Sequence, residues 1–156
     1  MKNSGYELRS IVQRYIPQLN ALTKEEFSAK PFPDKWSKSE VLGHLIDSAQ
    51  NNLRRFISAQ YESEPPCILY NQDFWVGIND YQSMPKDDLI QLWRLINERI
   101  CAICEATSEN KYNSLCNTGR EREELHTIAW LAADYIKHLK HHLNQIFPKS
   151  FDVVYP

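Results

Sequence analysis

The chain has 156 residues, of which 42% are hydrophobic and 24% are charged, with 18 basic residues against 20 acidic ones. This composition is typical of one globular domain, which we expect over residues 1–156. A formal charge of −2 without any basic block argues against a nucleic-acid partner. No apolar run approaches the roughly 18 residues that span a bilayer, and the N-terminus lacks a signal peptide's apolar stretch, so we expect no membrane partner and a cytoplasmic location.

Four long segments carry hydrophobic residues at helical spacing, and only four glycines occur in the chain. The pattern predicts an all-α four-helix bundle. Its expected helices cover residues 4–22, 37–61, 86–107 and 123–147.

Local signals mark several helix ends. Ser37 followed by Glu40 is a capping box, which predicts a helix start at that point. Pro148 stops the fourth helix, whereas Pro17 kinks or shortens the first. The start of the second helix is therefore the best defined.

Two segments between the predicted helices are long enough to suggest a functional role. Residues 62–85 mix aromatic and polar side chains, and we expect Asp73 and Trp75 to fold over the bundle end. There Asp73 would act as a catalytic proton acceptor or orient an imidazole. The alternative is that Asp73 caps a short turn and Trp75 simply packs on the bundle. Residues 108–122 are expected to form an exposed polar loop.

Histidines provide the clearest chemical signal. His138 and His142 are four residues apart, which places both imidazoles on one face of the fourth helix. A basic helix C-terminus also favours histidine, so the pair alone is a modest indication. His44 flanks the apolar stripe of the second helix, where a histidine is usually a core residue, yet here it could complete a three-histidine set. Leu139 follows the first histidine, so the zincin peptidase motif is absent.

Several nearby residues could support such a site. Asp134 could hold the free N–H of His138 or form an ordinary surface pair, and Asn51 could face the same cavity. His126 and His141 are expected on the surface or supporting the metal ligands.

The four cysteines are expected as free thiols, as in a reducing compartment. Cys101 and Cys104 form a Cys-x-x-Cys within a predicted helix without a second pair, so core packing is favoured over redox or zinc chemistry. Trp93, Trp130 and Tyr135 are expected in the core or at a subunit interface.

The segments 35–45, 70–75 and 134–146 together resemble the DinB/YfiT superfamily of bacterial four-helix metalloproteins. The resemblance spans nearly the whole chain in the right order. It implies that His44, His138 and His142 are the metal ligands, and that the chain forms a homodimer. Members of this superfamily are described as metal-dependent hydrolases, while characterised relatives transfer thiols such as bacillithiol, mycothiol or glutathione.

Three histidines with an open fourth position suit catalytic zinc, and imidazoles also suit nickel, iron or cobalt. We expect a divalent metal cofactor, zinc or nickel, that activates a low-molecular-weight thiol cosubstrate for transfer to an electrophilic small molecule. A metal-dependent hydrolase and a non-catalytic metal-binding dimerisation module stay open as alternatives.

Overall fold

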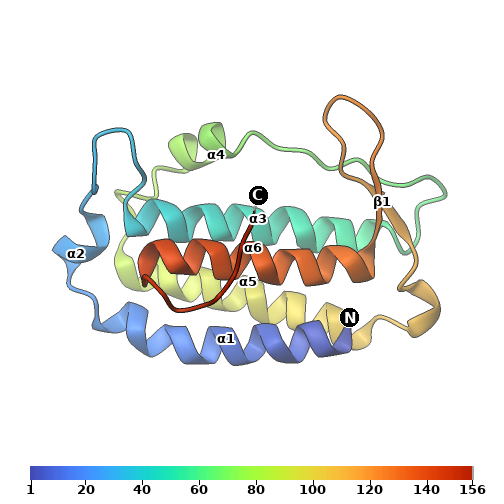
Figure 1. The fold of residues 1–156 in the computed structure, drawn as a ribbon, viewed down its shortest axis with the longest axis horizontal. Helices are drawn as coiled ribbons and strands as arrows, with labels where there is room; N and C mark the ends of the chain where they lie inside the picture. Colours follow the sequence, from blue (N-terminus) through green and yellow to red (C-terminus); the bar gives the residue numbers. More distant parts are fainter. Residues whose placement is uncertain (156) are drawn as a thin grey trace.

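The structure is a computed structural model, and it describes residues 1–155. In that range it contains six α-helices, a short 3-10 helix and one antiparallel hairpin. The bounds are α1 Lys2–Ala21, α2 Lys24–Ser28, α3 Lys38–Ser58, α4 Gln72–Asn79, α5 Lys86–Ala106, η1 Glu109–Lys111, β1 Leu115–Asn117, β2 Leu125–Thr127 and α6 Ile128–Ile146. The four long helices α1, α3, α5 and α6 form the predicted bundle (Figure 1).

The bundle has a non-sequential order around its axis. α1 packs against α5, α5 against α3, α3 against α6, and α6 closes the ring on α1 (Figure 1). The chain therefore crosses the bundle diagonally between α1 and α3. Because α3 and α6 are neighbours, side chains from the two predicted histidine-bearing helices can meet.

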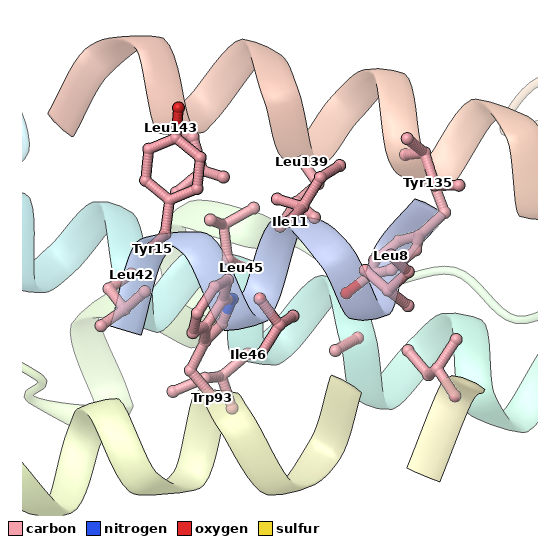
Figure 2. Close-up of a cluster of buried hydrophobic side chains, with 14 of the residues drawn as sticks. Leu8, Ile11, Tyr15, Leu42, Leu45, Ile46, Trp93, Tyr135, Leu139 and Leu143 are labelled. Carbon is pink, nitrogen blue, oxygen red and sulfur yellow. The ribbon is translucent and has the colours of Figure 1, made fainter. Parts of the chain in front are cut away.

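The core fills the space among all four long helices (Figure 2). Leu8 and Tyr15 of α1, Leu45 of α3, Trp93 of α5 and Leu139 of α6 are all fully buried. Burying side chains of this size supplies the main stabilisation of the domain.

The predictions for the cysteines are confirmed, and two of the three aromatic residues lie in the core. All four cysteines are free, and Cys101 and Cys104 are buried in the core as predicted. Tyr135 is buried, whereas Trp130 is 48% exposed and stacks on His126 with ring centroids 3.9 Å apart. Trp130 therefore lies outside the core, and its alternative place at a subunit interface stays a prediction.

The start of α3 has the predicted capping box. The Ser37 hydroxyl accepts from the Glu40 backbone N–H, and the Glu40 carboxylate accepts from the Ser37 backbone N–H. Thr23 and Glu26 form the same motif at α2, a short helix absent from the prediction. Five residues are too few for a detectable hydrophobic repeat, so only the capping residues could have indicated it.

The connections are more ordered than predicted. Residues 62–85 contain α4, with Asn71 as its N-cap, and residues 108–122 contain η1 and β1. The predicted fourth helix begins at Ile128 rather than at 123, because residues 125–127 pair with β1 as the second hairpin strand. Pro17 lies inside α1, which continues to Ala21 rather than ending at the proline.

The connection around α4 is tied to α3 by buried contacts. The Tyr81 hydroxyl donates to Asp47 Oδ1 over 2.5 Å, and Asn79 donates to the same oxygen over 3.3 Å. The Tyr81 ring lies directly over Gly43, where a Cβ would stand 2.0 Å from a ring carbon. A glycine is thus required where the segment crosses α3. Among the described residues, no helix is both long and apolar enough to cross a bilayer.

Candidate metal centre

Three imidazoles converge between α3 and α6. His44 Nε2 and His138 Nε2 are 3.2 Å apart, and one ring nitrogen from each of His44, His138 and His142 lies within 4.8 Å of the others. Two nitrogen ligands of one tetrahedral zinc ion stand about 3.3 Å apart, given bonds of roughly 2.0–2.1 Å. The spacing therefore suits one ion shared by the three rings. These are the three histidines that the sequence analysis predicted as ligands.

Neighbouring side chains orient two of the rings. His142 Nδ1 bonds to the Gln145 side-chain oxygen over 3.1 Å, so Nδ1 carries the proton and Nε2 keeps its lone pair. His138 Nδ1 lies 3.4 Å from the Ser48 hydroxyl. Both contacts leave the nitrogen on the other side of the ring free as a ligand, as metal-binding histidines require.

His44 is held differently. Its ring is fully buried and tilts against Trp36, with centroids 5.0 Å apart. Within residues 1–155 its Nδ1 has no hydrogen-bond partner. A buried imidazole without a partner is costly, and metal coordination by its Nε2 would offset part of that cost.

The environment keeps all three imidazoles neutral. Burial, with a contribution from the charge of His142, lowers the pKa of His44 to about 3. Burial likewise lowers the pKa of His142 to about 4 and that of His138 well below its ordinary value. Neutral imidazole is the form that binds metal, so the donor set is ready at neutral pH.

Other predicted site residues take different positions. Asp73 lies in the first turn of α4, is exposed, and lines a cavity beside the histidines. Trp75 packs edge-on against Tyr70, with centroids 5.4 Å apart. Asp134 bonds to the Tyr155 hydroxyl over 3.0 Å, so neither suggested role for Asp134 matches the structure. Asn51 is buried and donates to the Asp47 carbonyl.

Three residues that contact the histidine cluster were absent from the prediction. Ser48 and Gln145 lie one turn from His44 and His142, so helical spacing could have identified both. Tyr155 could not have been found this way. It lies in the segment after α6, which folds back across that helix and brings the Tyr155 ring to 5.3 Å from that of His138 (Figure 1).

Two cavities flank the three histidines. The first, here called the loop cavity, has a volume of about 750 Å³ and lies under the segment joining α2 to α3. Phe32, Trp36 and Val41 give it an apolar wall. It adjoins the histidines through Trp36, which packs on His44, and through Gln145, which bonds to His142.

The second, here called the hairpin cavity, has a volume of about 310 Å³ and lies between α3, α6 and the β1–β2 hairpin. His138 itself lines it. Polar side chains dominate its wall, among them Arg55, Tyr70, Arg120 and Tyr155. The candidate metal centre is thus bordered by one largely apolar and one polar cavity.

Comparison with known proteins agrees with this architecture. A family model described as the DinB superfamily matches residues 7–146. The chain belongs to this superfamily. A Bacillus licheniformis protein, named for a proposed metal-dependent hydrolase activity, is 24% identical over 127 residues, which make up 78% of this chain and 72% of the relative.

Solved structures share the fold of this DinB protein. YfiT from Bacillus subtilis, described as a candidate metal-dependent hydrolase with an unusual four-helix bundle topology, aligns with a TM-score of 0.81 and 19% identity over 93% of this chain and 83% of its own. A mycothiol-dependent maleylpyruvate isomerase aligns with a TM-score of 0.69 and 15% identity over 92% of this chain. This chain spans 60% of the isomerase's length.

Proposed function

We propose that this DinB protein transfers a low-molecular-weight thiol to an electrophilic small molecule, with one divalent metal ion, zinc or nickel, held by His44, His138 and His142. The observation that carries the proposal is the pair of unlike cavities beside one three-histidine cluster. A transferase must place two organic molecules at one centre, whereas hydrolysis needs only one and a water molecule.

A divalent metal with three imidazole ligands and an open side lowers the pKa of a thiol or water molecule that approaches it. The protein's own residues orient the ligands and line the two cavities. Neutral imidazoles, held by Ser48 and Gln145, keep their lone pairs directed at one point. The apolar wall of the loop cavity suits the electrophile, and the polar hairpin cavity suits the thiol.

The net reaction needs no further reactant. Sulfur forms a bond to the electrophilic carbon, the leaving group departs with its electron pair, and the thiol loses a proton. We propose that Asp73, at the rim of the loop cavity, accepts that proton or orients the electrophile. Cys101 and Cys104 take no part, because burial raises the pKa of each thiol, to about 11 and about 12.

The decisive experiment compares metal-loaded with metal-free protein in the conjugation of 1-chloro-2,4-dinitrobenzene to several small thiols. The new carbon–sulfur bond replaces the carbon–chlorine bond, and chloride release can be followed. We expect turnover only in the loaded protein. Equal rates in both preparations would overturn the proposal. Asp73→Asn should lower turnover while sparing bound metal, and Asp34→Asn, which also changes a carboxylate lining this cavity, is its matched control.

A metal-dependent hydrolase is the second candidate, because the names of the Bacillus relatives point to it. Metal-dependent release of nitrophenol from p-nitrophenyl acetate without any thiol, combined with no conjugation, would favour hydrolysis. Bound metal with neither reaction would favour a non-catalytic module.

The expected homodimer stays a prediction. Leu92 and Leu95 of α5 are 40% and 44% exposed, which offers an apolar surface for pairing. A monomer mass by light scattering would contradict it.

A further inference from the structure

The hairpin cavity holds two guanidinium groups without acidic partners. Arg55, half-buried on α3, donates to the Ile68 carbonyl and to the Asn52 side-chain oxygen, which are both neutral acceptors. Arg120, exposed on the hairpin loop, donates only to the Tyr70 carbonyl over 3.4 Å. In the part of the chain that the structure describes, neither arginine forms an ion pair.

The acidic groups of the same cavity have partners other than these two arginines. Glu124 lies 3.5 Å from Arg122, a residue outside this cavity. Asp134 accepts the hydroxyl hydrogen of Tyr155. A half-buried guanidinium that donates hydrogen bonds only to neutral acceptors has capacity for an anion, and the planar guanidinium group matches a carboxylate.

The same cavity contains both the two arginines and one of the candidate metal ligands. His138 lines it together with Arg55 and Arg120, and the Ser48 hydroxyl and Tyr155 ring border the same space. A small molecule that fills about 310 Å³ would therefore contact both the guanidinium groups and the His138 imidazole.

We propose that the hairpin cavity binds a thiol cosubstrate that carries a carboxylate group. Arg55 and Arg120 bind this carboxylate by hydrogen bonds and charge, while the thiol group of the same molecule reaches the histidine cluster. This inference rests on the proposed function, since it names the class of thiol that the enzyme uses. Neutral thiols lack the anionic group and should be poor cosubstrates.

The test measures binding to metal-free protein, so that its result does not depend on turnover. The metal is removed by chelation and the chelator by dialysis, because a polycarboxylate chelator would itself occupy the cavity. Mercaptosuccinate, its dimethyl ester and 2-mercaptoethanol are then titrated calorimetrically. We expect binding of mercaptosuccinate alone, weakened by added salt.

Matched arginine variants locate the binding. Arg120→Gln should weaken mercaptosuccinate binding about ten-fold, whereas Arg99→Gln, the same charge change at an exposed position of α5, should leave it within about two-fold. Arg55→Lys should also weaken it, because a lysine cannot reproduce the bidentate fork, and Arg54→Lys on the exposed side of α3 is its control. Thermal melting checks that Arg55→Lys folds.

The outcomes separate the two proposals. Equal binding of the acid and its ester, or equal losses in Arg120→Gln and Arg99→Gln, would overturn the carboxylate site while leaving thiol transfer standing. Arginine-dependent binding of mercaptosuccinate, together with no conjugation by the metal-loaded protein, would support the anion site and overturn the proposed transferase.

Discussion

The α1–α5 side of the bundle and the α3 side bury very different residues. Apart from Asn97, the buried positions of α1 and α5 are nonpolar or aromatic, or are cysteines. α3 has 13 buried positions, and six of them are polar. These are Ser39, His44, Asp47, Ser48, Asn51 and Asn52.

Buried polar groups cost free energy unless they find partners, so their concentration on one helix calls for an explanation. The polar positions of α3 contact α6, the α4 connection and the hairpin cavity, where the candidate chemistry lies. Asn97, the polar exception on the α1–α5 side, is bonded within the bundle, where it accepts from the Tyr135 hydroxyl and donates to the Trp93 carbonyl. One side of the bundle thus supplies stability, and the other gives up some stability to hold a site.

Removing one metal ligand should have the largest effect. We expect His142→Ala to weaken metal binding by more than about 100-fold, because only two imidazoles remain. His141→Ala, the neighbouring change outside the cluster, should keep about one ion per chain. Elemental analysis of both purified variants measures this, and undiminished metal in His142→Ala would refute its assignment.

A core truncation on the other side should affect stability alone. Leu8→Ala should lower the free energy of unfolding by about 2–5 kcal/mol, because Leu8 is fully buried between helices (Figure 2). Tyr6, which is 60% exposed on the same helix, provides the control Tyr6→Ala. Urea denaturation measures the change, and metal content should stay constant. Loss of metal in folded Leu8→Ala would show that the two sides are not separate.

The buried carboxylate of α3 should make stability depend on pH. Burial raises the pKa of Asp47 from 3.8 to about 6, despite the hydrogen bond from Tyr81. The folded state therefore binds this proton more tightly than the unfolded state. The resulting stabilisation is complete below pH 3.8 and is lost as the pH rises through about 6.

Asp47→Asn should remove this loss, because the amide oxygen still accepts from Tyr81 and no charge forms. Its gain in unfolding free energy relative to the unsubstituted protein should grow between pH 4 and 7, up to about 3 kcal/mol. Taking the difference between the two proteins cancels the contribution of the histidines. A gain independent of pH, as expected for the exposed control Asp34→Asn, would contradict the assignment.

Two glycine substitutions test the close contact over α3. Gly43→Ala should lower stability by about 1–3 kcal/mol, since its Cβ would meet the Tyr81 ring. Gly77 in α4 has nothing within 4 Å of an added Cβ, so Gly77→Ala should stabilise by about 0.5–1 kcal/mol through helix propensity. Thermal unfolding distinguishes them, and equal shifts of the same sign would refute the packing argument.

The sequence by itself determined the features that depend on local geometry. A helix repeats every 3.6 residues, so hydrophobic spacing predicts the four long helices, and the spacing of His138 and His142 places both on one face. The Ser37–Glu40 capping box acts over a single turn, and it predicts the start of α3 for the same reason.

Only the tertiary structure decided how distant segments meet. His44 stands 94 residues before His138 in the sequence. The two imidazoles meet only because α3 and α6 pack side by side in the bundle. The hairpin pairs two three-residue strands too short to show alternation, so it was predicted partly as loop and partly as helix. Both cavities, and the return of Tyr155 over α6, likewise arise from packing between segments remote in sequence, which local spacing does not encode.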